Sequence, residues 1–365
     1  MHYLDANATQ PMRPEAKAAV VATLDMTGNP ASVHQAGRAV RRHLEAARET
    51  LAERFGGRAQ DVVFTSGGTE ADALALHTFS PNRRVLISAI EHDAVRVAAL
   101  DPIVLPVGAD GVVDLDVLET VLRDDVPSLV CLMLANNETG VVQPVAQAAA
   151  ICRQHGALLH VDAVQAVGRM EVNLLAAGAH SLAISSHKLG GPAGIGALLM
   201  AQDAPFTAPL IAGGGQERGR RGGTPSVALA AGFAAAASAT DNWAWLAELR
   251  DQAEAAAVAS GAVVCGDATN RLPNTTCLAL PGVRADAQVI ALDLEGVAVS
   301  AGAACSSGKV ATSHVLRAMG LGPLASEAIR VSLPWNATRA NINAFAAAYP
   351  RVAARLRSAL VPRAA

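Results

Sequence analysis

Ser185, His187 and Lys188 are the residues whose types most directly suggest chemistry, because they follow an apolar run over residues 181–184. Such a run is typical of a buried parallel strand, of which only the end meets solvent or a ligand. A lysine at that end can lose its proton at low cost and act as an amine nucleophile toward a carbonyl group. The alternative is an exposed lysine at the start of a loop, where isolated lysines usually lie.

Polar side chains also follow other strand-like runs of the chain. His92, Asn137, Asp162 and Gln165 each come shortly after an apolar run. Because the carboxyl ends of parallel strands meet at one edge of a sheet, we expect these side chains to converge on one pocket. A single histidine or aspartate at a strand end would usually be structural, so it is their convergence that indicates a ligand site.

The segment Ser66-Gly67-Gly68-Thr69-Glu70 joins a predicted strand over residues 62–65 to a predicted helix over residues 71–77. Free backbone N–H groups and the positive end of the helix dipole meet at such a turn and form an anion site. An ordinary tight turn between a strand and a helix is the alternative.

Together these groups match the needs of one cofactor. An aspartate at the end of a buried strand can keep a pyridinium nitrogen protonated, and a lysine can bind the aldehyde of the same ring. A histidine can stack on the ring face, and a helix N-terminus with hydroxyl groups can take a phosphate. That set describes pyridoxal 5'-phosphate (PLP), an electron sink for charge on the carbon next to a bound amine. The protonated ring nitrogen draws that charge from the substrate in the transition state.

Two residues nearer the C-terminus are further candidates. Cys305 lies among small residues in the run from 300 to 309, where a thiol with a pKa of about 8.5 has a minor thiolate fraction at neutral pH. It is either a nucleophile on a long-reaching loop or an incidental surface cysteine. Arg330 is a charge inside a strand pattern and needs an anionic partner, which is either a substrate carboxylate or an internal carboxylate.

The repeat of strand, polar tip and helix predicts an α/β fold with a mostly parallel sheet wrapped by helices. A helix is predicted to follow the turn at residues 28–32 and to end at Gly56, and an Ala-rich helical region over residues 227–260 leads into a second domain. We expect the large domain to span residues 13–250, and the small domain to combine residues 1–12 with residues 251–365.

The small domain is also predicted to be α/β. Its expected elements are a strand over residues 275–280, a helix capped by Asp286, a helix capped by Ser313 and a strand over residues 328–333. In the large domain, the Gly/Arg loop at residues 213–224 could serve an anion or a subunit contact, or it could be a flexible surface loop.

Composition excludes several classes of protein. The chain has 365 residues, of which 51% are hydrophobic, and a net charge of −3 without an isolated Lys/Arg block. This balance argues against a nucleic-acid or membrane partner. The start of the chain does not resemble a signal peptide and the most apolar helix candidate is too short for a bilayer, so we expect a cytoplasmic protein. We expect no metal site, and we expect structural roles for four cysteines: Cys131, Cys152, Cys265 and Cys277.

Six segments, in this order along the chain, resemble the class V aminotransferase family and within it the NifS/IscS-type cysteine desulfurases. They are Gly28-Asn29-Pro30-Ala31-Ser32, Thr65-Ser66-Gly67-Gly68-Thr69-Glu70, Asn136-Asn137-Glu138-Thr139-Gly140, His160-Val161-Asp162-Ala163-Val164-Gln165, Ser185-Ser186-His187-Lys188 with Gly191-Pro192, and Ser300-Ala301-Gly302-Ala303-Ala304-Cys305. The resemblance covers nearly the whole chain. It implies a PLP-dependent transferase of fold type I.

The resemblance also implies roles for the site residues. PLP would be bound on Lys188, with Asp162 on the ring nitrogen, Gln165 on the phenolic oxygen and His92 stacked on the ring and moving protons. The phosphate would be held by a set of small and polar residues: Gly68, Thr69, Ser185, His187 and, from the partner subunit of a homodimer, Thr224. Asn137 would contact both cofactor and substrate.

For the reaction, the resemblance implies that Arg330, Asn137 and Asn29 take the carboxylate of L-cysteine. Cys305 would attack the substrate sulfur, keep it as a persulfide and release L-alanine, and the sulfur would pass to an iron–sulfur scaffold or another acceptor protein. One alternative is a selenocysteine lyase or another PLP enzyme of the same fold, which would not need Cys305. Another is a non-catalytic sulfur carrier, which would bind no cofactor.

Overall fold

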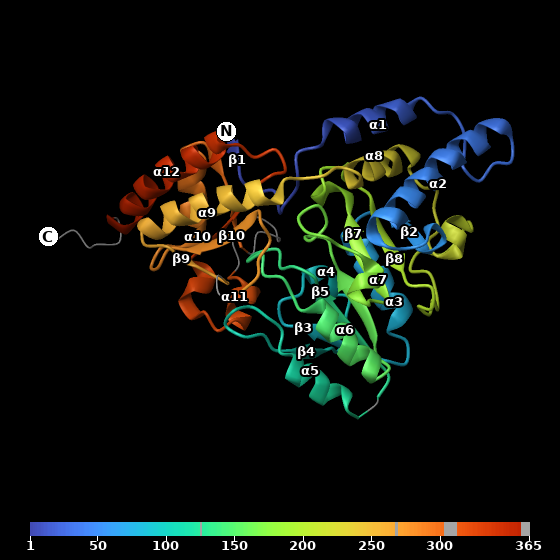
Figure 1. Cartoon of the computed structure of the whole chain (residues 1–365), viewed down its shortest axis with the longest axis horizontal. Coiled ribbons are helices and arrows are strands. Elements are labelled where there is room, and N and C mark those ends of the chain that lie inside the picture. Colours follow the sequence, from blue (N-terminus) through green and yellow to red (C-terminus); the bar gives the residue numbers. More distant parts are fainter. Residues whose placement is uncertain (125, 267–268, 303–311, 359–365) are drawn as a thin grey trace.

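A seven-stranded sheet forms the centre of the larger part of the molecule (Figure 1). The computed structural model describes residues 1–124, 126–266, 269–302 and 312–358. The strand order is β2-β8-β7-β6-β5-β3-β4. The strands are β2 (Val62–Thr65), β8 (Gly196–Met200), β7 (Ser181–Ser185), β6 (Leu158–Asp162), β5 (Ser128–Met133), β3 (Arg84–Ser88) and β4 (Ile103–Leu105). Only β8 runs against its neighbours, so the sheet is mostly parallel, as predicted.

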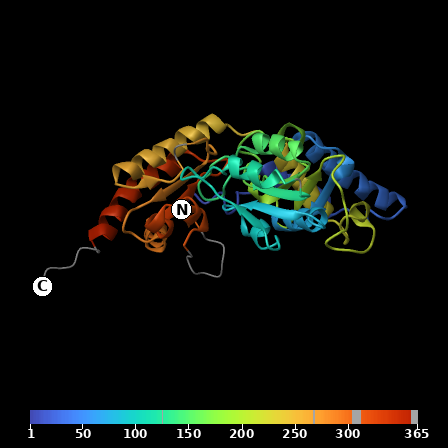
Figure 2. The ribbon, with the colours of Figure 1, turned by 90° about the horizontal axis from the view of Figure 1, so that it is seen from below.

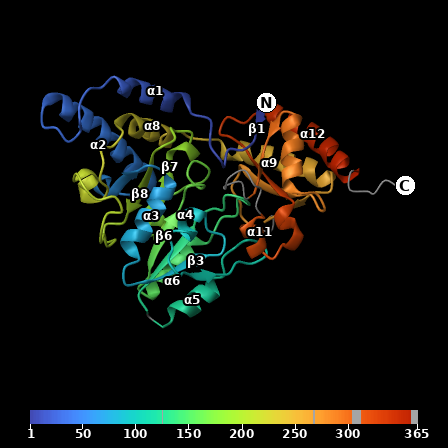
Figure 3. The ribbon, with the colours of Figure 1, turned by 180° about the vertical axis from the view of Figure 1, so that it is seen from behind.

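Both faces of this sheet are buried because the strands are apolar on both sides. Alternate residues of each strand point to opposite faces, so Val130 and Leu132 of β5 join one core while Leu129 and Cys131 join another. The first core is covered by α2 (Gln35–Phe55), α5 (Leu115–Leu122), α6 (Val145–Gln154) and α8 (Val227–Ala237). The second is covered by α3 (Gly68–Phe79), with α4 (Asp93–Arg96) beside it, on the side seen in Figure 3.

A second part of the chain lies beside the first, as the view from below shows (Figure 2). Its antiparallel sheet has the order β12-β13-β10-β9, formed by β12 (Ser300–Ala301), β13 (Ala328–Ser332), β10 (Thr275–Ala279) and β9 (Val263–Val264). The helices packed with its core are α9 (Trp243–Ala259), α10 (Ala285–Leu294) and α12 (Arg339–Ser358). A shorter helix, α11 (His314–Ala318), packs on the side toward the large sheet.

The N-terminus belongs with this second part. Strand β1 (His2–Tyr3) pairs in parallel with β11 (Val297–Ala298), and Leu4 is buried in the second core. The chain then crosses to the large sheet through α1 (Pro14–Leu24), which packs on α8. The predicted boundary at residue 250 falls inside α9, whose Leu246 and Leu249 are buried in the second core. The domain limits stay a prediction.

The predicted helical region over residues 227–260 is wrong in one respect, because α8 and α9 are separate helices. The polar residues at the break stop the first and start the second: the Asn242 side chain accepts a hydrogen bond from the Trp245 N–H (3.0 Å). The prediction of Asp286 as a cap is also wrong. Asp286 lies in the first turn of α10 and pairs with Arg284, which holds the cap position without a side-chain cap bond.

Other local predictions are confirmed. Gly56 ends α2 in the left-handed conformation (φ 73°), which a residue without a Cβ adopts at low cost. Ser313 caps α11 through the Leu316 N–H. Across the described part of the chain, the helices are too short or too polar to cross a membrane.

Candidate active site

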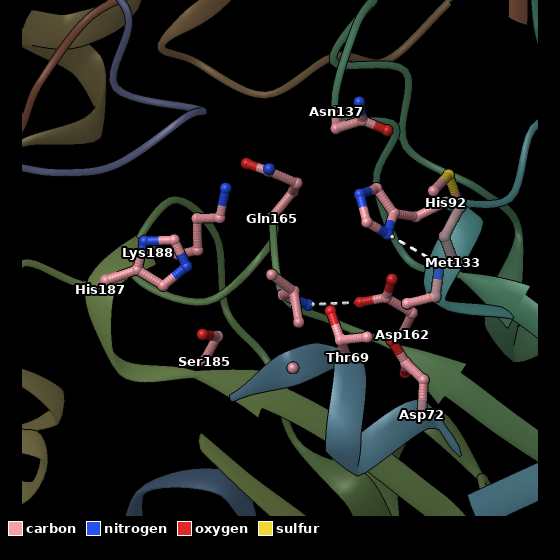
Figure 4. Close-up of a pocket in the computed structure, with 13 residues that line it drawn as sticks. Thr69, Asp72, His92, Met133, Asn137, Asp162, Gln165, Ser185, His187 and Lys188 are labelled. Atoms are coloured by element: carbon pink, nitrogen blue, oxygen red, sulfur yellow. Dashed lines mark hydrogen bonds between the residues drawn. The ribbon is translucent and has the colours of Figure 1, made fainter. Parts of the chain in front are cut away.

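The carboxyl ends of neighbouring strands surround a cavity of about 230 Å³ (Figure 4). Its lining includes nine of the predicted site residues, which come from α3, from the segment after β3, from the loop after β5, from β6 and from the turn after β7: Gly68, Thr69, His92, Asn137, Asp162, Gln165, Ser185, His187 and Lys188. The structure therefore brings together residues that lie up to 120 positions apart in sequence, from Gly68 to Lys188.

Lys188 ends a 3₁₀ turn, η2 (Ser186–Lys188), which directly follows β7. Its ammonium group donates hydrogen bonds to the backbone carbonyls of Asn7 and Ala8, the latter at 3.0 Å. The turn thus places a half-buried amine in the pocket and the N-terminal segment supplies acceptors for it. The Asn7 side chain in turn donates to the Asn137 carbonyl (3.1 Å) and to the Thr275 hydroxyl (3.0 Å), so the segment is fixed to both parts of the chain.

Asp162 is the last residue of β6 and is buried. One carboxylate oxygen accepts a hydrogen bond from the Val164 N–H (2.8 Å), which fixes its direction (Figure 4). Burial raises the pKa of Asp162, while the Val164 bond and the positive charges of His92 and Lys188 oppose the rise. A cationic ring nitrogen placed against this carboxylate would restore its charged form.

His92 caps the short helix α4. Its Nδ1 accepts a hydrogen bond from the Ala94 N–H (3.1 Å), so the neutral imidazole carries its proton on Nε2. Because the cap fixes the ring, His92 can give or take a proton at Nε2 without turning.

A group of buried acids lies beneath Asp162. Asp72 of α3 lines the pocket and contacts His160 Nε2 (3.1 Å), whose Nδ1 contacts the Ser181 hydroxyl (2.8 Å). Burial lowers the pKa of His160 to about 3, so its ring is neutral. Burial, together with the negative charges of Asp162 and Glu91, raises the pKa of Asp72 well above its usual range. The buried surroundings of Asp72 thus favour its neutral form more than water would.

The opposite end of the pocket suits an anion. The N-terminus of α3 and the hydroxyls of Thr69 and Ser185 border it. Gly68 allows the start of α3 to lie close to Val164, because a Cβ at position 68 would lie only 2.7 Å from Val164 Cγ2. Burial and the charges of Lys188 and Arg169 lower the pKa of His187 to about 4, so its ring is a neutral hydrogen-bonding group.

Two predicted residues lie outside this pocket in the single chain. Asn29 lines another cavity, of about 350 Å³, with Arg48 and Glu217. Thr224 lines a third, with Ser66 and Arg221. Thr224 is predicted to act from a partner subunit, so its position in its own chain does not test that prediction. Cys305 lies outside the described residues.

Arg330 adjoins the pocket without lining it. Its guanidinium pairs with Asp5 (2.7 Å) and donates to the Asn137 carbonyl (3.1 Å), so the internal ion pair considered as an alternative is present. Arg330 Nε and Asn137 Oδ1 are buried without a hydrogen-bond partner among the described residues. The Arg330 Nε–H is a donor that a bound carboxylate could use, whereas Asn137 Oδ1 is an acceptor and would need a donor group of a ligand.

Several residues in or beside the pocket were not predicted as site residues from the sequence. Asp72 stands one helical turn after Thr69 and His160 two residues before Asp162, so helix and strand periodicity could have indicated them. Asn7 and Arg169 gave no such signal, because their contacts join distant segments.

A lysine and a buried aspartate held at the ends of adjacent strands of this sheet are the arrangement expected of a PLP-dependent enzyme of fold type I. The model of the Aminotransferase class-V family matches residues 2–345. An IscS-like cysteine desulfurase of Mycobacterium tuberculosis is 38% identical, over 98% of this chain and 98% of its own length. A cysteine desulfurase of Cereibacter sphaeroides is 41% identical, over 98% of this chain and 96% of its own.

Among solved structures, the X-ray structure of a NifS-like protein from Rickettsia africae superposes with a TM-score of 0.88 and 34% identity, covering 96% of this chain and 99% of that one. The chain belongs to the class-V aminotransferase family, as the sequence motifs predicted. The family depends on PLP, and the residues present fit this cofactor: the pocket offers an amine, an acid, a histidine and an anion site in one cavity.

Proposed function

We propose that this chain is a cysteine desulfurase that uses PLP to take sulfur from L-cysteine and release L-alanine. The observation that carries the proposal is the meeting of Lys188, Asp162 and His92 in one cavity at the strand ends of a single sheet. The full-length similarity to cysteine desulfurases selects this reaction from those that PLP enzymes perform.

PLP, when bound, supplies an electron sink for negative charge that develops on the substrate. Lys188 would bind its aldehyde, and the carbonyls of Asn7 and Ala8 hold the amine toward the pocket. Asp162 would keep a proton on the ring nitrogen. Among the buried acids of this cluster, Asp162 is the one whose charged form is favoured by the charges of His92 and Lys188 and by the hydrogen bond from the Val164 N–H.

His92 would stack on the ring and exchange protons with the substrate at Nε2. Thr69, Ser185 and His187 would hold the phosphate against the N-terminus of α3. We propose that Thr224 completes this site from the partner subunit of a homodimer, since it lines a different cavity of its own chain.

Arg330 and Asn137 would take the substrate carboxylate, assisted by Asn29. Arg330 already holds an anion, Asp5, so the substrate carboxylate would share or replace that partner. The Cys305 thiolate would attack the substrate sulfur, forming an S–S bond as the C–S bond breaks. The electron pair of the C–S bond stays with the carbon skeleton, which takes up a proton and leaves as alanine.

The sulfur then resides on Cys305 as a persulfide, from which a cytoplasmic iron–sulfur scaffold or another acceptor protein would take it. An enzyme of the same fold that acts on selenocysteine would release selenium without Cys305. Whether product release requires Cys305 therefore distinguishes the two functions.

The test is incubation of the PLP-loaded protein with L-cysteine, followed by alanine analysis and by peptide mass spectrometry of Cys305. We expect alanine and added sulfur on Cys305, and loss of both in Cys305→Ser. The control is Cys265→Ala, which alters a buried thiol of the second part of the chain. Full sulfide release from L-cysteine by Cys305→Ser would contradict the proposal. A protein that binds no PLP would favour the sulfur carrier.

A further inference from the structure

Arg169 is a buried charge close to the pocket that the proposed reaction does not use. Its side chain is 2% exposed. One guanidinium nitrogen donates to both the backbone carbonyl and the side-chain oxygen of Gln165, at 2.7 and 2.6 Å, and the other donates to the Ala6 carbonyl (3.2 Å). All three acceptors are neutral oxygens, so the arrangement is not an ion pair.

These contacts fix which end of the Gln165 amide faces the pocket. A guanidinium has no acceptor, so only Oε1 of Gln165 can face Arg169. On the other side, Gln165 Nε2 donates to the Asn7 carbonyl (3.1 Å), which has no donor. Two independent neighbours therefore require the same orientation, and the amide has a second N–H for a ligand.

The positive charge of Arg169 also favours the Gln165 N–H as the donor toward the pocket. Burial lowers the pKa of Arg169 to about 9, and the charge of Arg330 contributes to the lowering while Asp241 opposes it. The guanidinium stays protonated at neutral pH. The other charged groups that face this corner are Lys188 and Asp162. A positive charge on the oxygen side polarises the amide and strengthens its N–H as a donor.

We propose that Arg169 is a positioning residue that acts through Gln165, holding the amide so that an N–H faces the phenolic oxygen of PLP. This inference rests on the proposed function. An N–H directed at that oxygen stabilises its negative charge, which makes the nearby Lys188 nitrogen a poorer base. Arg169 thus lowers the pH at which the Lys188 nitrogen loses its proton in the loaded enzyme.

The experiment is a pH titration of the visible absorption band of the PLP-loaded protein. Arg169→Met removes one of the two contacts that orient the Gln165 amide and the charge that polarises its N–H, so we expect the midpoint to rise by about 0.5–1 pH unit, equivalent to the free energy of about one hydrogen bond. Arg169→Lys, which keeps the charge and one donor, should shift it less. Arg250→Met is the matched control, since Arg250 also donates to a backbone carbonyl, that of Leu272 (2.8 Å), and neither residue lines the pocket.

A second titration separates action through Gln165 from a general effect of charge. In a Gln165→Ala background, Arg169→Met should leave the midpoint unchanged. An equal shift in both backgrounds, or no shift in the single variant, would overturn the inference. Should Arg169→Met not fold, Arg169→Gln carries the same test. Absence of any visible band, or a band that persists in Lys188→Ala, would instead contradict the proposed function.

Discussion

Replacing Glu91 by glutamine should change how the stability of this protein depends on pH. Glu91 is fully buried beneath the pocket, where one carboxyl oxygen accepts hydrogen bonds from the Ser88 hydroxyl (2.5 Å) and the Met133 N–H (2.9 Å). The other oxygen has no hydrogen-bond partner in the part of the chain that the structure describes. Burial raises the pKa of Glu91 from 4.5 to about 8, and the charge of Asp162 contributes to the rise.

The raised pKa fixes the sign and the size of the effect. Between pH 4.5 and 8 the folded protein binds a proton at Glu91 that the unfolded chain has lost, so stability falls as pH rises through that window. Integrated from pH 5 to pH 8, this one group costs about 3 kcal/mol of unfolding free energy. Glutamine stays neutral, so Glu91→Gln removes the cost.

The assay is urea unfolding of both proteins at several values between pH 5 and 8. We expect the unfolding free energy of Glu91→Gln, relative to the original protein, to increase by about 3 kcal/mol across this range. Asp72 and Asp162 are present in both proteins, so their titration enters the comparison only through its coupling to Glu91. A difference that stays constant within about 0.5 kcal/mol would refute the assignment of Glu91 as a neutral buried acid.

Three further predictions concern the buried acid Asp162, the turn before α3 and the link between the two parts of the chain. Asp162→Asn should still bind PLP but lose turnover by about 10²-fold or more, because a neutral amide no longer favours the protonated ring nitrogen; near-normal alanine production would contradict this. Gly196→Ala should destabilise the protein by about 1–3 kcal/mol in thermal unfolding, since its Cβ would lie 2.5 Å from the Gly67 carbonyl carbon; an unchanged melting temperature would argue against that packing. Asn242→Ala should cost about 1 kcal/mol by removing the cap of α9, and Asn242→Asp, which keeps the cap, should not.

The sequence predicted those pocket residues whose position follows directly from the strand that precedes them. Lys188, Asp162 and His92 could be predicted because each follows a strand, and the ends of parallel strands share one edge of the sheet. The antiparallel direction of β8 was not predicted, because an apolar run has the same composition in either direction.

Residues whose contacts join distant segments could not be predicted. Asn7 sits in a short polar lead-in, and its role arises from hydrogen bonds to Asn137 and Thr275, which are 130 and 268 positions away. Arg169 likewise depends on the Ala6 carbonyl. The break between α8 and α9 was missed because alanine favours helix on both sides of it, while the polar residues at 238–242 stop the helix.

The central claim, that this pocket holds PLP on Lys188, can be tested directly by borohydride reduction of the PLP-loaded protein, digestion and mass spectrometry. The test is sharp because the only other lysines of the sequence are Lys17 and Lys309. The account predicts that the reduced cofactor is found on the peptide that contains Lys188, and that it is absent from the Lys17 and Lys309 peptides. Cofactor on either of those peptides, with an unmodified Lys188, would contradict it.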